Sequence, residues 1–162
     1  MKINNYLIIR DKLTNNPSLK IESTFSWKND FLSQDNIVDF LNQKYRMDIL
    51  EEEYVYVISF NWQMVPQGVF QLSHGTAKNS LIGKRELAIF LLLTGANKFI
   101  LAHNHPNGSK EFSKEDVEIT EEIMEMADAI GVKFEQHFTI GNDGYDTIIE
   151  DEDDDRMPFG LK

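Results

Sequence analysis

The sequence of 162 residues contains no cysteine. Disulfide bonds are therefore excluded, and so is any metal site that depends on thiolate ligands. The site of the cytidine deaminases is excluded for the same reason, because it needs a pair of cysteines spaced Cys-x-x-Cys. A zinc ion in this chain would have to be held by imidazole nitrogens and carboxylate oxygens.

Long apolar runs are also missing. The longest one, residues 87–93, is far shorter than the roughly 20 residues that a membrane-spanning helix needs. Residues 1–5 lack the apolar region of a signal peptide. We therefore expect a cytoplasmic protein without a membrane-spanning segment.

Positive charge is scarce, since 16 Lys and Arg stand against 27 Asp and Glu for a formal net charge of −11. Proteins that bind the phosphate backbone need clustered Lys and Arg, so we do not expect direct nucleic-acid binding. Six of the acidic residues form one run, residues 150–155. Such a run predicts a solvated acidic tail over residues 151–162. A docking tail for a basic partner and a DNA-mimicking patch are the alternatives.

The pattern of apolar residues predicts strands and helices that alternate around one core. After a strand at residues 6–9, the chain is polar and weakly patterned as far as Asp30. Helical spacing then favours helices at residues 35–45, 85–93 and 114–129. Runs rich in β-branched and aromatic residues predict strands at residues 54–60, 68–72, 99–101, 132–140 and 145–149. The expected class is α/β, with a mixed sheet flanked by helices.

The most informative motif is His103-Asn104-His105, followed by Asp116. Two imidazoles at i and i+2 project from the same side of an extended segment, and a carboxylate at the start of the next helix can complete a three-ligand site. Three protein ligands leave a fourth position open, as in catalytic zinc sites. The alternative is structural: a chance His-x-His, with Ser113 as helix N-cap and Asp116 as the acid of a capping box.

Hydrolysis at such a site also needs a base, and a glutamate is the usual choice in zinc hydrolases. The upstream candidates are Glu51, Glu52, Glu53 and Glu86. Spacing alone does not choose among them, because three consecutive glutamates are also typical of a solvated surface and Glu86 could pair on its own helix.

The motif resembles that of the JAB/MPN metalloproteases (the JAMM motif), and within them the RadC branch. The family pattern is an upstream Glu, then His-x-His, seven residues, Ser, two residues and Asp. This chain supplies it as His103-Asn104-His105, Ser113 and Asp116. The RadC signature HNHPSG is similar to His-Asn-His-Pro-Asn-Gly at residues 103–108, and the segment that begins with Glu53 resembles the family's glutamate before a β-strand.

The resemblance implies a deaminase-like α/β sandwich over residues 35–150, while the role of residues 1–34 stays open. It implies one Zn²⁺ per chain on His103, His105 and Asp116, with Glu53 as general base and Ser113 as a hydrogen-bond donor to the developing oxyanion or to the attacking water. The implied reaction is hydrolysis of a peptide or isopeptide bond in a protein or peptide substrate. A catalytically silent zinc-binding adaptor and an accessory protein of DNA repair or of a mobile element are the alternatives. The sequence indicates no oligomeric state.

The loop after the histidines departs from the family pattern. Asn107 replaces the usual Ser, and Ser109, Lys110 and Phe112 stand where relatives tend to have Asp-Pro and Pro. None of these changes removes a ligand. His137 resembles the family's closing histidine, and we interpret it as a strand histidine packed in the core.

Overall fold

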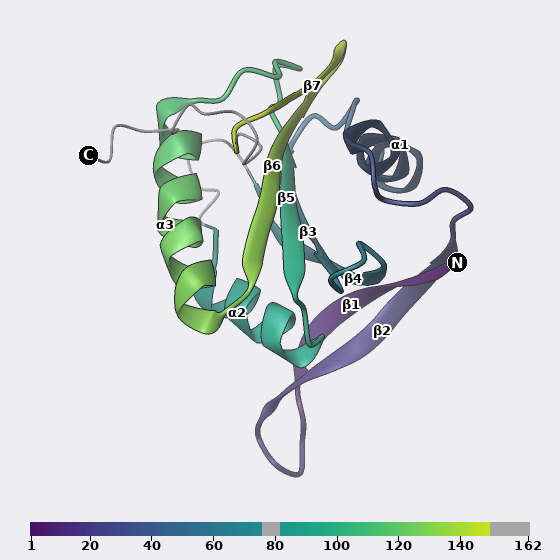
Figure 1. Cartoon of the computed structure of the whole chain (residues 1–162), viewed down its shortest axis with the longest axis vertical. Helices are drawn as coiled ribbons and strands as arrows, with labels where there is room; N and C mark the ends of the chain where they lie inside the picture. Colours follow the sequence, from purple (N-terminus) through teal and green to yellow (C-terminus); the bar gives the residue numbers. More distant parts are fainter. Residues whose placement is uncertain (76–81, 150–162) are drawn as a thin grey trace.

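The computed structural model describes residues 1–75 and 82–149 of the chain (Figure 1). Within these residues the chain forms one mixed sheet of seven strands together with three helices, which confirms the predicted α/β class. The elements are β1 (Lys2–Arg10), β2 (Pro17–Ser26), α1 (Gln34–Tyr45), β3 (Glu53–Phe60), β4 (Pro66–Gly75), α2 (Lys84–Leu93), β5 (Lys98–Asn104), α3 (Lys114–Ile130), β6 (Lys133–Gly141) and β7 (Gly144–Thr147). Across the sheet the strands lie in the order β2-β1-β4-β3-β5-β6-β7.

Neighbouring strands are antiparallel except in two places, where β1 pairs with β4 and β5 pairs with β6. Parallel neighbours need a connection that crosses back over the sheet, and α3 provides it between β5 and β6. In this βαβ unit, the carboxyl end of β5 and the beginning of α3 lie at the same end of the strands. Ligand sites of α/β sheets commonly lie there, beyond the carboxyl ends of the strands.

Helices cover both faces of the sheet, with α1 on one side and α2 and α3 on the other (Figure 1). Along β3, Tyr56 and Ile58 pack into the core beneath α1. Val55 and Val57 point the opposite way and pack with α2 and α3, as strand alternation requires. A strand that is buried on both faces has apolar residues at consecutive positions, which explains the continuous apolar runs of β3 and β5.

The N-terminal hairpin was predicted only in part. The predicted strand at residues 6–9 lies within β1, but the polar, weakly patterned segment after it, for which we predicted no element, folds into β2. β2 pairs with β1 alone at the edge of the sheet, and none of its side chains is buried. A strand without a buried face has no alternating apolar pattern, so its sequence carries little signal.

The helices begin and end close to the predicted residues. α1 starts at Gln34, where the Ser33 side chain accepts a hydrogen bond from the Asn36 N–H at 3.2 Å. α3 ends at Ile130, and Gly131 follows with a φ of 72°, a left-handed conformation that favours glycine. The last strand is shorter than predicted, because β7 ends at Thr147.

The predicted acidic tail, residues 151–162, lies outside the described residues. Within residues 1–75 and 82–149, no helix is both long and apolar enough to cross a membrane.

Candidate metal centre

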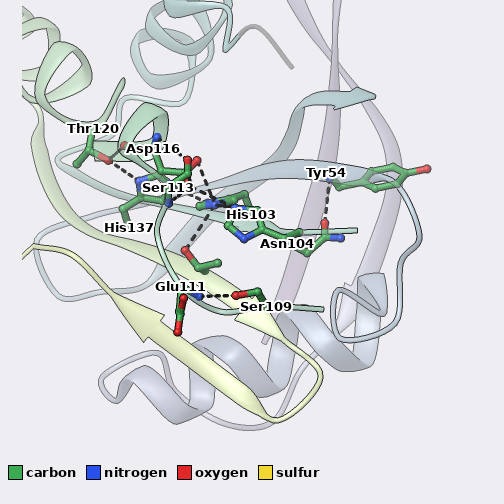
Figure 2. A network of polar contacts seen from close by, with 11 residues as sticks. Tyr54, His103, Asn104, Ser109, Glu111, Ser113, Asp116, Thr120 and His137 are labelled. Atoms are coloured by element: carbon green, nitrogen blue, oxygen red, sulfur yellow. Dashed lines mark hydrogen bonds and ion pairs between the residues drawn. The ribbon is translucent and has the colours of Figure 1, made fainter. Parts of the chain in front are cut away.

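The two histidines of the motif lie at the end of β5, and Asp116 lies in the first turn of α3. Figure 2 shows His103 beside Asp116. His103 belongs to β5, and His105 follows the strand directly after Asn104. The βαβ connection thus brings together the three candidate ligands of the motif. His103 is buried, whereas His105 and Asp116 are partly exposed, which gives solvent access to the group.

The donor atoms of these residues lie within 4.8 Å of one another, close enough to share one metal ion. His103 Nε2 and His105 Nε2 are 3.2 Å apart. Asp116 Oδ2 lies 3.2 Å from His105 Nε2, and Asp116 Oδ1 lies 3.4 Å from His103 Nε2. Zinc with bonds of about 2.0–2.1 Å to tetrahedral ligands holds neighbouring ligand atoms about 3.3–3.4 Å apart. The residues therefore fit a zinc ion in both donor type and spacing.

Asp116 also closes the start of α3. Ser113 is the N-cap: its Oγ accepts a hydrogen bond from the Asp116 N–H at 3.1 Å. In return, Asp116 Oδ2 accepts from the Ser113 N–H and from the Ser113 hydroxyl, both at 2.7 Å. The capping box and the ligand set are therefore compatible, because the cap fixes the carboxylate that faces the histidines.

A buried chain of hydrogen bonds sets the protonation of His103. The Thr120 hydroxyl donates its single proton to the Asp116 carbonyl at 2.6 Å. Thr120 Oγ1 must then accept from His137 Nδ1 at 2.7 Å, which leaves His137 Nε2 without a proton. His137 Nε2 accepts in turn from His103 Nδ1 at 2.9 Å. His103 Nε2 therefore carries the lone pair, and this is the nitrogen that faces the other two ligands.

His137 is a strand histidine buried in the core, 1% exposed, as we interpreted it from the sequence. The structure adds its contact with His103. Burial, followed by the nearby His103, holds the pKa of His137 well below the usual value, so His137 stays neutral as the hydrogen-bond chain requires. Orientation of a metal-binding histidine by a partner on its other ring nitrogen is a common feature of metal sites.

The charges of the site favour a cation. Burial alone would raise the pKa of Asp116, but its hydrogen bonds with His105 and Ser113 help to hold that pKa far below its usual range. The hydrogen bond to Asp116 raises the pKa of His105 against the opposing effect of burial. The negative charge of Glu53 also raises the pKa of His105. Glu53 therefore interacts electrostatically with one of the candidate ligands.

The position of Glu53 follows from the pairing of β3 with β5. Val55 is paired with His103 at the last position of the β3–β5 ladder, and Glu53 lies two residues before Val55 at the start of β3. Residues two apart in a strand share a face, so Glu53 points to the same side of the sheet as Val55 and the histidines.

Two of the other acidic candidates have side-chain partners of their own. Glu52 has its Oε2 4.0 Å from Nε2 of His74. Glu86 lies in the first turn of α2, with its Oε1 3.7 Å from Arg85 Nη1.

The loop between His105 and Ser113 is fixed despite its departures from the family pattern. The Asn107 side chain accepts from the Ser109 N–H at 3.0 Å, and the Ser109 hydroxyl accepts from the Glu111 N–H at 3.1 Å. The loop also lies directly against the end of β6, where a Cβ on Gly141 would lie 2.5 Å from the Gly108 carbonyl oxygen. The ring of Phe112 packs edge-on against the imidazoles of His103 and His137.

Sequence reasoning did not identify Thr120 as part of the site. Its position four residues after Asp116 is a signal, because these two residues share a helix face. However, the contact with His137 depends on how α3 packs against β6, and no local pattern shows it.

Comparison with known proteins gives a family match. A family model described as the RadC-like JAB domain matches residues 31–153. The chain is 29% identical to a UPF0758 protein of Clostridium botulinum (strain Alaska E43 / Type E3) over 119 residues, which are 74% of this chain and 51% of that protein.

A UPF0758 protein of Symbiobacterium thermophilum is 35% identical over 105 residues, which are 65% of this chain and 45% of the relative. A UPF0758 protein of Staphylococcus epidermidis is 30% identical over 104 residues, 64% of this chain and 46% of the relative. The chain thus spans about half the length of the curated relatives that it matches.

Proposed function

The chain belongs to the family of RadC-like JAB domains, and from this membership we propose that it is a zinc-dependent hydrolase that cleaves a peptide or isopeptide bond. The observation that carries the proposal is the donor set of His103, His105 and Asp116, whose atoms lie 3.2 to 3.4 Å apart. Two imidazoles and one carboxylate leave a fourth position for water or substrate, which distinguishes a catalytic zinc site from a structural one.

Zinc at this position, when bound, lowers the pKa of a water molecule toward neutrality and polarises the carbonyl group of a substrate. The residues around the ion would hold its ligands in place. Asp116 supplies negative charge that is fixed by the Ser113 cap, and His137 holds the ring of His103 with Nε2 toward the other ligands. The ligand side is therefore preorganised before any ion binds.

Glu53 is the residue that we assign as general base. It would take the proton of the attacking water and deliver it to the leaving amine. Two observations support the assignment: Glu53 shares a sheet face with the histidines through the β3–β5 register, and its charge raises the pKa of His105. Neither supports Glu52, which lies near His74.

Ser113 would stabilise negative charge that develops on the substrate oxygen. In this structure its hydroxyl donates to Asp116 Oδ2, so the hydroxyl must turn away from the carboxylate to serve a substrate. This engagement favours a second candidate function, a zinc-binding adaptor that performs no hydrolysis and uses Ser113 only as a helix cap.

A substrate screen separates the two functions. The zinc-loaded protein is incubated with a library of fluorogenic peptides, half joined through α-peptide bonds and half through the ε-amine of lysine. We expect cleavage of one class, and a loss of about two to four orders of magnitude in rate for Glu53→Gln with zinc retained. Glu52→Gln is the matched control, because it removes the neighbouring carboxylate, which lies near His74, and should keep the wild-type rate.

Zinc bound at one equivalent, without cleavage of either class, would favour the adaptor. A wild-type rate in Glu53→Gln would refute the assignment of the base while leaving a zinc hydrolase in place.

A further inference from the structure

Asn104, the residue between the two histidines, has no place in the ligand set, yet it is 1% exposed and makes three hydrogen bonds. We propose that Asn104 is a positioning residue that fixes Glu53 relative to the metal ligands. This inference rests on the proposed function, in which Glu53 is the base.

The three hydrogen bonds of the Asn104 side chain go to the backbone of the segment that carries Glu53. Its Nδ2 donates to the carbonyl of Glu52 at 2.9 Å and to the carbonyl of Leu50 at 3.3 Å. Its Oδ1 accepts from the N–H of Tyr54 at 2.9 Å. Figure 2 shows Asn104 extended toward Tyr54 and away from Asp116 and His137.

Two of these bonds hold the two peptide groups on either side of Glu53. The Glu52 carbonyl belongs to the peptide bond before Glu53, and the Tyr54 N–H belongs to the peptide bond after it. With both peptide groups fixed, the backbone dihedral angles of Glu53 are fixed, and so is the direction of its Cα–Cβ bond. The amide of Asn104 therefore fixes the direction in which the Glu53 side chain leaves the backbone.

Asn104 acts at the point where regular pairing between β3 and β5 ends. The ladder of paired residues runs from Phe60 and Lys98 to Val55 and His103. At the next position the Asn104 side chain, and not the backbone, binds the Tyr54 N–H. The side chain thus continues the connection between the strands where their backbones no longer pair.

The position of Asn104 between His103 and His105 links the candidate ligands to the backbone of the base. Successive side chains of an extended segment alternate between faces, so Asn104 points away from the side on which His103 and His105 offer their nitrogens. One segment of three residues therefore holds two ligands on one side and the backbone of the base on the other. A shift of that segment would move ligands and base together and preserve their separation.

Asparagine suits this position because its amide offers both donors and an acceptor. Aspartate would keep the acceptor for Tyr54 but would place oxygen against the carbonyls of Leu50 and Glu52. Alanine would leave three backbone groups without their partner, which costs stability at any site. A test must therefore separate positioning from stability.

The test uses Co²⁺ as the probe, because its visible absorption reports on the groups around the ion and no substrate is needed. The cobalt-loaded wild type is titrated with alkali, and the midpoint of the spectral change is compared with that of Glu53→Gln. We expect the two midpoints to differ, because Glu53 is the acceptor for the proton that the site releases.

Asn104→Ala and Asn104→Asp should each bind one Co²⁺ and shift the midpoint in the same direction as Glu53→Gln. The double variant with Glu53→Gln should shift no further than Glu53→Gln alone, since both changes remove the same interaction. Asn5→Ala is the matched control: Asn5 is also buried and hydrogen-bonded through its side chain, to Glu22 and Tyr45, but on β1. Its midpoint should equal that of the wild type.

Wild-type midpoints in both Asn104 variants would overturn the positioning role while leaving the proposed function intact. Loss of Co²⁺ binding in both would also overturn it, because Asn104 would then hold the ligands and not the base. A wild-type midpoint in Glu53→Gln itself would overturn the base assignment of the proposed function, and with it this inference.

Discussion

Replacement of Thr120 by valine tests how the fold prepares His103 for a metal ion. Valine has nearly the same shape but removes the hydroxyl that donates to Asp116 and accepts from His137, at 2.6 and 2.7 Å. In Thr120→Val, His137 can keep its proton on Nδ1 only by leaving that buried group without an acceptor. If the proton moves to Nε2, it opposes the proton on His103 Nδ1, and His103 must then carry its own proton on Nε2, where the metal would bind.

The expected loss of zinc affinity follows from these two tautomers of His137. A buried donor without a partner costs about 1–3 kcal/mol. Metal binding demands the tautomer that incurs this cost, so the cost appears as lost affinity. Since about 1.4 kcal/mol corresponds to a factor of ten, we expect zinc to bind about 10 to 100 times more weakly, in the range found for other residues that orient metal ligands.

The assay is competition for Zn²⁺ against a chromophoric chelator of known affinity. Thr120→Ser keeps the hydroxyl and should bind zinc as the wild type does. Thr94→Val is the matched control, because the Thr94 hydroxyl also donates to a helix carbonyl, that of Phe90 at 2.9 Å, but on α2. Wild-type affinity in Thr120→Val, or an equal loss in Thr94→Val, would refute the role of the Thr120–His137 chain.

The remaining predictions concern stability, the loop and pH. Chelation of zinc should leave the circular-dichroism spectrum unchanged, because buried residues on both faces of the sheet form the core without the site; collapse of the spectrum would contradict this. Gly141→Ala should lower the free energy of unfolding in urea by about 1–3 kcal/mol and weaken zinc binding, because its Cβ meets loop backbone at 2.5 Å. Gly75→Ala, whose Cβ would meet nothing within 4 Å among the described residues, should change neither. Because Asp116 raises the pKa of His105, the zinc-free wild type should have a higher Tm than His105→Gln below about pH 6.5. That advantage should shrink as the pH rises through the raised pKa, and an advantage that grows with pH would contradict the assignment.

The sequence predicted those elements that bury a face. α1 and α3 have helical spacing of apolar residues, and β3 and β5 have consecutive apolar residues because both of their faces are covered. β2 escaped prediction because it gains its hydrogen bonds from β1 and buries no side chain. Its conformation is a tertiary effect.

The candidate ligands could be predicted because their geometry is local. His103 and His105 are separated by one residue of an extended chain, and Asp116 lies at a fixed offset from its helix cap. The structural and metal-binding interpretations of Ser113 and Asp116 looked like alternatives in the sequence, but in the structure one carboxylate takes part in the cap and also faces both histidines. The hydrogen bonds that set the His103 tautomer join α3, β5 and β6, and only the folded chain reveals them.

Crystals of the protein soaked in Zn²⁺, with diffraction data collected on both sides of the zinc absorption edge, test the central claim most directly. We expect one anomalous peak about 2.0–2.2 Å from His103 Nε2, His105 Nε2 and an oxygen of Asp116. The carboxylate of Glu53 should lie within reach of the open fourth position through no more than one water molecule. A peak bound by other residues, or no peak at this group, would contradict the assignment of a catalytic metal centre.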